Sequence, residues 1–346
     1  MGNDMLNVGL SQYDRRVSAK VLLFLCVRLS GYNVSMSEGD HLAAMKVLFF
    51  GLPAGISAAV LAELTSWGAV TGVVVPAAAV PHLLTDVASP VITLEPGRFD
   101  SLTIMGGQSR ADTLGVAWEA GLPVLAVRDF ANPHAVSALR ALAADVAVVA
   151  CFNRRIPAAL LAIPRHGFLN LHPSLLPDYR GPVPLFWQLR DGAPTGVTVH
   201  YMDDGFDTGD IVAQKALPLP DGSAGAESES TLMLAGVDLL RDILADLSRG
   251  VINRRPQPSG GSAQSFPQPG DFVLSTTWPA RRAFNFMRGT AHFGVPYPVA
   301  LAGDTVRLAV ADHFEPAAEL DRPSVRHGRS ILIRFNPGIL YARMAD

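Results

Sequence analysis

The chain has 346 residues, of which 49% are hydrophobic and 17% are charged, and its formal net charge is -3. This length allows two soluble domains with cores of their own. The charge balance argues against a general polyanion-binding protein, so we expect no DNA partner.

The cysteines and the apolar runs point to a reducing cytoplasm. Cys26 and Cys151 lie far apart, with neither metal-site spacing nor a disulfide framework. The longest aliphatic run near the start, residues 21–27, is too short to cross a bilayer, and no small-residue cleavage site follows it. We therefore expect a cytoplasmic protein without a membrane span. Residues 1–44 precede the first expected strand and form an extension of doubtful status.

From residue 45 onwards, strand-like and helix-like segments alternate, which predicts a doubly wound, Rossmann-like α/β domain with a mostly parallel sheet over residues 45–250. We expect a helix near residues 111–120, and Asn132 should cap another helix whose first turn contains Pro133. The expected strands cover residues 45–51, 69–75, 123–127, 146–151, the strand ending at 172, and 211–219, with a short apolar stretch at 102–105.

A long helix over residues 230–249 should close this domain. Residues 251–270 are rich in Pro, Gly, Ser and Gln, which is typical of a linker. A small β-rich domain should occupy residues 271–346. We expect one helix at 279–288 and strands at 272–275, 305–311 and 330–335.

The most informative residues are Asn170, His172 and Asp207. Asn170 and His172 alternate at the end of a buried strand, so their side chains share one face. Doubly wound sheets bind ligands at the carboxyl ends of their strands, and Asp207 from a later loop would complete a polar site there. By contrast, Gly51 and Gly55 follow the first strand with the spacing of neither a dinucleotide fingerprint nor a P-loop.

This trio suits the transfer of an acyl group between two nitrogens, a reaction with a tetrahedral, oxyanion-bearing carbon and a proton to move. An Asn amide can donate to the oxyanion, and such contacts are worth about 10²–10³ in rate. Imidazole relays protons near neutral pH, and a carboxylate fixes its tautomer, favours its charged form and orders water. An isolated Asn-x-His more often satisfies loop backbone. The residues around Asn170 and His172 therefore decide between a catalytic and a structural interpretation.

Those residues resemble the folate-dependent formyltransferase family, which includes methionyl-tRNA formyltransferase, glycinamide ribonucleotide formyltransferase and the amino-sugar N-formyltransferases. The matching blocks are residues 167–172, 175–181, 184–187, 195–200 and 203–210. The resemblance implies that Asn170, His172 and Asp207 are catalytic. It also implies that 10-formyltetrahydrofolate donates the formyl group and that no metal is required.

The resemblance implies further site residues. Two walls of the folate pocket, acting mainly through main-chain contacts, would be Phe152, Asn153, Arg154, Arg155 and Ile156 on one side and Asp203, Asp204 and Gly205 on the other. Arg154 and Arg155 are equally well explained as solvent-facing side chains. A loop beside the acceptor would contain Ser174, Leu176, Pro177, Arg180 and Gly181. Arg180 would either bind an anionic acceptor group or pin the loop to a carboxylate. Thr198 and His200 share one face of their strand and either support the catalytic residues or belong to the core.

The acceptor amine is the open question. Methionyl-tRNA formyltransferases carry a basic insertion after the second strand, whereas residues 76–96 contain no Lys or Arg. We therefore favour a small amine such as a nucleotide amino sugar. Initiator methionyl-tRNA is the alternative, because the region from residue 251 leans positive. A formyltetrahydrofolate hydrolase and a non-catalytic folate-binding module are further alternatives. Trp278, Ala283, Asn285, Arg288 and Gly289 resemble the start of a barrel-like carboxy-terminal domain found in the tRNA and sugar branches.

Overall fold

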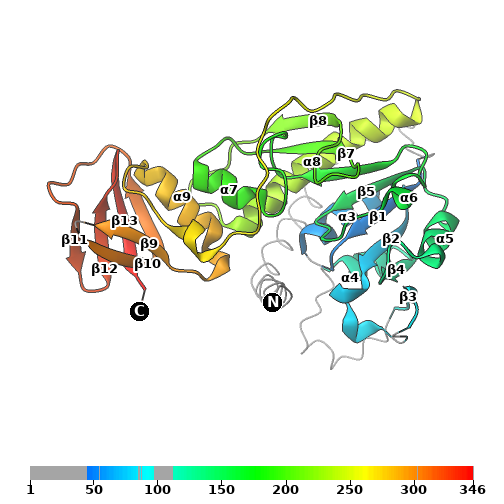
Figure 1. Cartoon of the computed structure of the whole chain (residues 1–346), viewed down its shortest axis with the longest axis horizontal. Coiled ribbons are helices and arrows are strands. Elements are labelled where there is room, and N and C mark those ends of the chain that lie inside the picture. Colours follow the sequence, from blue (N-terminus) through cyan, green and yellow to red (C-terminus); the bar gives the residue numbers. More distant parts are fainter. Residues whose placement is uncertain are drawn as a thin grey trace.

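The computed structural model describes residues 45–53, 55–84, 86, 88–96, 112–301 and 303–345. It contains a larger domain built on an eight-stranded sheet and a smaller domain built on a five-stranded sheet, joined along the long axis of the molecule (Figure 1). The extension at residues 1–44 and the apolar stretch at 102–105 lie outside the described residues.

The first sheet has the order β3-β4-β2-β1-β5-β6-β7-β8. The run from β4 through β2, β1 and β5 to β6 is parallel, whereas β3, β7 and β8 each pair antiparallel to a neighbour. The strands are β1 Val47–Gly51, β2 Val70–Pro76, β3 Val91–Leu94, β4 Val124–Val127, β5 Val146–Ala150, β6 Phe168–His172, β7 Gly196–Tyr201 and β8 Ile211–Ala216. The predicted doubly wound, mostly parallel sheet is thus confirmed.

The central strands are apolar on both faces because helices cover both. Along β1, Val47 and Phe49 face one core, and Leu48 and Phe50 face the other. The first core also contains α3 (Gly55–Ser66), α4 (Thr113–Glu119) and α8 (Gly225–Ser248), and the second contains α5 (Pro133–Ala141) and α6 (Ala158–Leu161). Asn132 caps α5 as predicted, since its side-chain oxygen accepts the backbone N–H of His134 at 2.9 Å.

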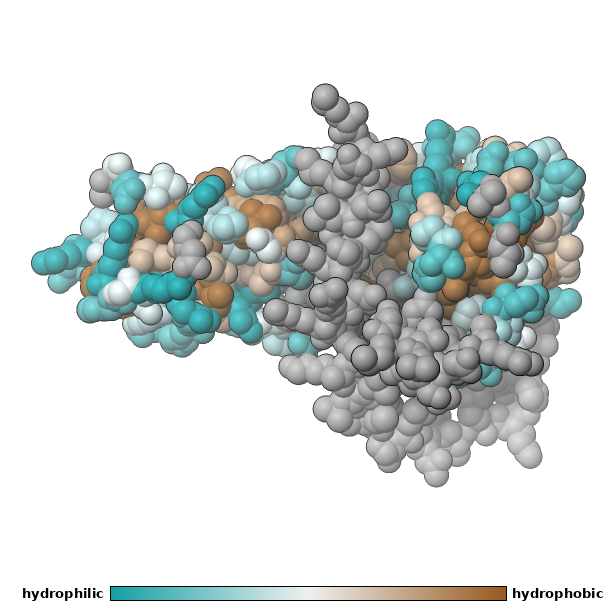
Figure 2. Space-filling view, turned by 90° about the horizontal axis from the view of Figure 1, so that it is seen from below, coloured by the Kyte–Doolittle hydropathy of each residue, from teal (hydrophilic) through white to brown (hydrophobic). Residues whose placement is uncertain are grey.

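The smaller domain is an antiparallel, curled sheet of order β11-β12-β13-β10-β9 with helix α9 (Ala280–Thr290) packed on it. Its strands are β9 Tyr297–Leu301, β10 Asp304–Glu315, β11 Ser324–His327, β12 Ser330–Arg334 and β13 Ile339–Met344, and short 3-10 turns lie at Pro269–Phe272 and Ala291–Phe293. This β-rich carboxy-terminal domain confirms the prediction. On the face seen in Figure 2, hydrophilic and hydrophobic residues of this domain are interspersed.

The strand predicted at residues 272–275 is wrong. A 3-10 turn, Pro269–Phe272, ends there, closed by reciprocal hydrogen bonds between Gln268 and Asp271, and only Leu274 makes a bridge, to Val299. Phe272 and Leu274 are buried while Val273 is exposed. This alternation imitates a strand, although it arises from two side chains reaching into the core on either side of a bend.

Helix α7 (Pro184–Asp191) joins the two domains through its aromatic side chains. The Phe186 ring lies 5.0–5.6 Å from those of Phe272, Phe286 and Phe293, which belong to the carboxy-terminal cluster. Trp187 donates its ring N–H to the backbone oxygen of Ser265 at 3.0 Å. The helix that follows the catalytic segment is therefore part of the second core. Across the described ranges, no helix is both long and apolar enough to span a membrane.

Candidate active site

The pairing of β6 with β7 places four polar side chains on one face of the sheet. Asn170 lies directly opposite His200, and His172 lies opposite Thr198. Their neighbours Leu169 and Leu171 enter the core under α8, so the polar side chains emerge on the other face. The predicted shared face of Asn170 and His172 is present at the carboxyl end of β6.

Asp207 reaches this face from the turn between β7 and β8. Its backbone is left-handed, with φ 55°, a conformation that is uncommon outside glycine. Asp203 shapes the turn, because its carboxylate accepts the backbone N–H of Gly205 at 2.9 Å and the hydroxyl of Thr208 at 2.7 Å. A side chain at Gly209 would overlap the backbone oxygen of Tyr201. The turn is thus held tightly against the end of β7.

Asn170, His200 and Asp207 form one hydrogen-bonded group. The Asn170 amide nitrogen lies 3.0 Å from His200 Nε2 and 3.3 Å from Asp207 Oδ1. His200 Nδ1 lies 2.8 Å from the backbone oxygen of Tyr201, which can only accept, so Nδ1 carries the proton. The Asn170 amide nitrogen can only donate, so Nε2 of His200 accepts from it. His200 therefore orients the Asn170 amide.

His172 is 5% exposed and lies between two acceptors. Its Nε2–H donates to the backbone oxygen of Tyr179 at 2.8 Å, and Nδ1 faces Asp207 Oδ2 at 3.6 Å. The second distance is too long for a hydrogen bond but short enough for a strong charge interaction. The ring therefore has one free nitrogen beside a carboxylate, an arrangement in which a proton arriving at Nδ1 would be stabilised.

Burial and charge act in opposite directions on this pair. Burial lowers the pKa of His172 below its ordinary value, although Asp207 acts to raise it. Burial alone would raise the pKa of Asp207, but His172 and the backbone N–H of Gly181, at 2.8 Å, hold the pKa of Asp207 well below its usual range. Asp207 is therefore ionised near neutral pH, and His172 is a neutral ring that can accept a proton.

The first expected folate wall has an apolar inner side and an open backbone. Phe152 packs edge-on against Phe50 and Phe130, and Ile156 is 2% exposed, so both side chains support the wall from the core. Within the described residues, the backbone groups of residues 153–155 make no hydrogen bond to other backbone groups. These backbone groups are therefore not committed to a helix or a sheet.

A cavity of about 370 Å³ adjoins this wall. Arg155 donates to the backbone oxygen of Asp204 at 3.0 Å, which links the two expected folate segments. Arg154 lines the cavity and makes no ion pair with any residue that the structure describes. The lining consists of Arg128, Asp129, Phe130, Ala131, Arg154, Arg155, Pro157, Ala158 and Asp204.

The expected acceptor loop is braced from the sheet by Thr198. The Thr198 hydroxyl donates to the backbone oxygen of Ser174 at 2.7 Å and accepts the N–H of Leu176 at 3.1 Å. Ser174 in turn donates to the backbone oxygen of Asp178. Gln214 on β8 donates to the backbone oxygen of Leu176 at 2.6 Å. Thr198 thus supports the loop that supplies the partner of His172.

Arg180 pins the loop, although not to a carboxylate. Its Nε and Nη2 donate to the side-chain oxygen of Gln257 at 3.0 and 2.7 Å, and its Nη1 donates to the backbone oxygen of Gly260 at 3.3 Å. The guanidinium is therefore occupied by residues of the expected linker. Three contributors were not predicted: Tyr179, Gln214 and Gln257. Only Tyr179 lies within a block that matches the family, residues 175–181, and its contribution is a backbone oxygen.

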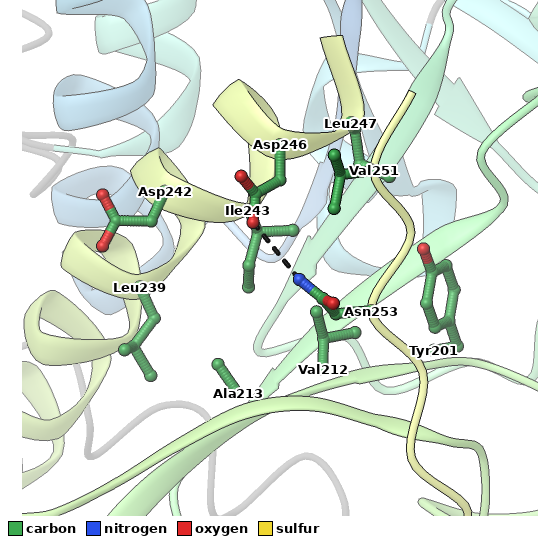
Figure 3. Close-up of a pocket in the computed structure, with 10 residues that line it drawn as sticks. All are labelled: Tyr201, Val212, Ala213, Leu239, Asp242, Ile243, Asp246, Leu247, Val251 and Asn253. Atoms are coloured by element: carbon green, nitrogen blue, oxygen red, sulfur yellow. Dashed lines mark hydrogen bonds between the residues drawn. The ribbon is translucent and has the colours of Figure 1, made fainter. Parts of the chain in front are cut away.

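A second cavity, of about 140 Å³, lies on the opposite face of the sheet between α8, β8 and residues 251–253 (Figure 3). Asp246 there accepts a hydrogen bond from Asn253 at 3.2 Å. Leu239, Ile243 and Leu247 of α8 line it. The sheet separates this cavity from Asn170 and His172.

Comparisons with known proteins by family pattern, by sequence and by fold all match formyltransferases. The formyl transferase family pattern matches residues 108–235. The methionyl-tRNA formyltransferase of Thermodesulfovibrio yellowstonii is 34% identical over 188 residues, covering 54% of this chain and 59% of that protein. That of Synechococcus sp. (strain JA-3-3Ab) is 33% identical over 226 residues, covering 62% and 69%. The N-formyltransferase of Helicobacter canadensis, crystallised with folinic acid and dTDP-3-aminofucose, shares the fold, with a TM-score of 0.57, 12% identity, and coverage of 87% and 99%.

Proposed function

The chain belongs to the formyl transferase family, whose members transfer formyl groups, and from this premise we propose that it is an N-formyltransferase that uses 10-formyltetrahydrofolate. The observation that carries the proposal is the buried group of Asn170, His172 and Asp207 at the carboxyl end of β6. It combines an amide donor, a neutral imidazole and a fixed carboxylate within one hydrogen-bonded site.

His172 is the proton acceptor in this proposal. Its Nε2 is committed to the backbone of Tyr179, so the proton of the attacking amine passes to Nδ1, directly or through one water, and from Nδ1 it returns to the donor nitrogen as the bond between that nitrogen and the formyl carbon breaks. Asp207, 3.6 Å from Nδ1, stabilises the charged ring that results. General base catalysis of this kind contributes about 10²–10⁴ in rate.

Asn170 stabilises the oxyanion through its amide N–H groups. Of its two contacts, that to Asp207 Oδ1 is the longer, at 3.3 Å, and is therefore the weaker and more readily exchanged. His200 keeps the amide orientation fixed through the other contact, at 3.0 Å. A donor aimed at a developing oxyanion is worth about 10²–10³ in rate.

The residues around the cavity suit a folate ring. The open backbone groups of residues 153–155 supply donors and acceptors at one edge, and Phe152 and Ile156 support them from the core. When bound, 10-formyltetrahydrofolate supplies the formyl group. The folinic acid bound by the Helicobacter canadensis protein supports this choice of ligand.

The acceptor that we favour is a small amine such as a nucleotide amino sugar. The segment that follows β2, residues 76–96, contains no Lys or Arg, and its described part includes two 3-10 turns (Ala77–Ala79 and Pro81–Leu83) and β3. A protein that binds an RNA backbone needs Lys or Arg side chains that face the phosphates. Initiator methionyl-tRNA is the second candidate, because the relatives compared by sequence are methionyl-tRNA formyltransferases.

The test is incubation with 10-formyltetrahydrofolate and a panel of amines that includes nucleotide amino sugars and charged initiator tRNA, following release of tetrahydrofolate. We expect release that depends on an amine and that falls at least 10²-fold in Asn170→Ala, His172→Ala and Asp207→Ala. Activity on the tRNA alone would select the second candidate. Release of formate without any amine would identify a hydrolase, and folate binding without turnover of any amine would identify a binding module.

A further inference from the structure

The segment predicted as a linker lies against the candidate active site as an ordered strap, which we define as residues 255–265. At its start, Arg255 exchanges two backbone hydrogen bonds with Ile211, at 2.8 and 2.9 Å. Towards its end, Arg180 donates its N–H to Ser262 and accepts that of Gln264, both at 2.9 Å. The strap is therefore paired with β8 at one end and with the acceptor loop at the other.

Strap and loop touch backbone to backbone, which requires glycine on both sides. A side chain at Gly261 would overlap the backbone oxygen of Pro177, and one at Gly181 would overlap that of Gln264. Both glycines also have positive φ, at 80° and 95°. This contact is built into the backbone conformation and does not depend on flexible side chains alone.

Gln257 uses both ends of its carboxamide in this contact. Its oxygen accepts Nε and Nη2 of Arg180 at 3.0 and 2.7 Å. Its nitrogen donates to the backbone oxygens of Asp207 at 2.7 Å and Gly209 at 2.8 Å. One half-buried side chain thus links the acceptor loop to the turn that carries Asp207. Both lone pairs of its oxygen and both hydrogens of its nitrogen are used.

The two segments that Gln257 links are the two that hold His172. The partner of His172 Nε2 is the backbone oxygen of Tyr179, the residue before Arg180, and the partner of Nδ1 is Asp207. The carboxylate of Asp207 also accepts the N–H of Gly181 at 2.8 Å. Fixing Arg180 and the Asp207 backbone therefore fixes both acceptors around the imidazole.

We propose that Gln257 is a positioning residue for formyl transfer, which sets the place and orientation of His172 from outside the catalytic domain's sheet. The inference rests on the proposed function for its rate measurements. Misplacement of a catalytic group by about 1 Å costs about 10²-fold in rate. We expect Gln257→Met, which keeps the length of the side chain but removes its hydrogen bonds, to lower kcat about tenfold to a hundredfold and to change KM for the folate less than threefold.

The matched control is Ser259→Ala, two residues along the same strap. Ser259 is exposed, and within the described part of the chain its side chain makes no hydrogen bond. Gln257→Ala serves as a second variant, and urea unfolding of each variant shows whether it is folded under the assay conditions. The second readout is the ¹H–¹⁵N titration of the His172 imidazole, which needs no turnover. We expect the His172 titration to change in both Gln257 variants and to be unaltered in Ser259→Ala.

The outcomes separate the two ideas. If the wild type transfers formyl groups and both Gln257 variants match Ser259→Ala in kcat and in the His172 titration, the positioning role is refuted. If the wild type transfers no formyl group to any amine, the proposed function fails, and the His172 titration alone decides whether Gln257 positions the ring. A loss of folding in both variants would assign Gln257 to stability and would also overturn the inference.

Discussion

Replacing Asp207 by Asn tests the electrostatic core of the proposed site while leaving its shape nearly unchanged. Oδ1 and Oδ2 of Asp207 face Asn170 and Gly181, and an amide can keep at most one of these acceptor contacts. For Nδ1 of a charged His172 at 3.6 Å, an effective dielectric constant of about 20 gives an attraction of about 4 to 5 kcal/mol. That energy corresponds to at most about 5 × 10³-fold in rate. We expect kcat to fall about 10²–10³-fold.

The direction of the pH effect follows from the same pair. Asp207 acts to raise the pKa of His172 against burial. Asp207→Asn removes that influence, so the pKa of His172 falls further and the acidic limb of the pH–rate profile moves to lower pH. The assay is amine-dependent release of tetrahydrofolate between pH 5 and 8, with Asp210→Asn as the control in the same turn region. A variant within threefold of the parental rate, with an unmoved acidic limb, would contradict the assigned roles.

Three further predictions concern stability and reactivity. Phe186→Ala should lower the free energy of unfolding in urea by about 3–5 kcal/mol, because Phe186 is 1% exposed and lies in the carboxy-terminal aromatic cluster. The control is Phe206→Ala. The Phe206 side chain is 73% exposed, so its removal should change the free energy of unfolding by less than about 0.5 kcal/mol. Burial and the charge of Glu229 raise the pKa of Cys151 to about 12. In a Cys26→Ser background, alkylation of Cys151 at pH 8 should therefore be about 10³-fold slower than that of an ordinary thiol. An alkylation rate equal to that of an ordinary thiol would contradict this prediction. The folded state lowers the pKa of His172, so this residue's stabilising effect is present above the ordinary pKa of about 6.5 and is lost as pH falls below it; urea unfolding at pH 7.5 and 5.5 should show a smaller difference in His172→Gln than in the wild type.

Periodicity predicted the parallel core well because each central strand is a continuous apolar run bounded by helical segments. It failed where an element is short or pairs at an edge. β3 has four residues between Pro90 and Glu95, and only its pairing with β4 identifies it as a strand. Residues 272–275 have the alternation of a strand without its hydrogen bonds. The local sequence pattern predicts which side chains are buried. Whether the backbone that carries them is a strand depends on its pairing with other segments of the fold.

The candidate site was predictable where its chemistry resides in side chains. Asn170, His172 and Asp207 stand in motifs that carry their residue types, and the strand period placed the first two on one face. The partner of His172 Nε2 is a backbone oxygen, that of Tyr179, and any residue can supply one. The open backbone of residues 153–155 is equally independent of residue type. Such contributions depend on the path of the chain, which composition does not specify.

The strap shows why a polar, glycine-rich segment can be read as a linker and still organise a site. Gly260, Gly261 and the flanking Ser and Gln residues have the composition of a flexible connection. Two features make this segment ordered: close approach to Pro177, which only glycine permits, and a carboxamide whose donor and acceptor are both matched by neighbouring groups. Glycine raises the entropy lost on ordering, so the paired backbone bonds and the Gln257 contacts must offset that cost. A segment can therefore be flexible in the unfolded chain and ordered in the folded one. What distinguishes this ordered strap from a flexible linker is that its polar groups have hydrogen-bond partners in the fold.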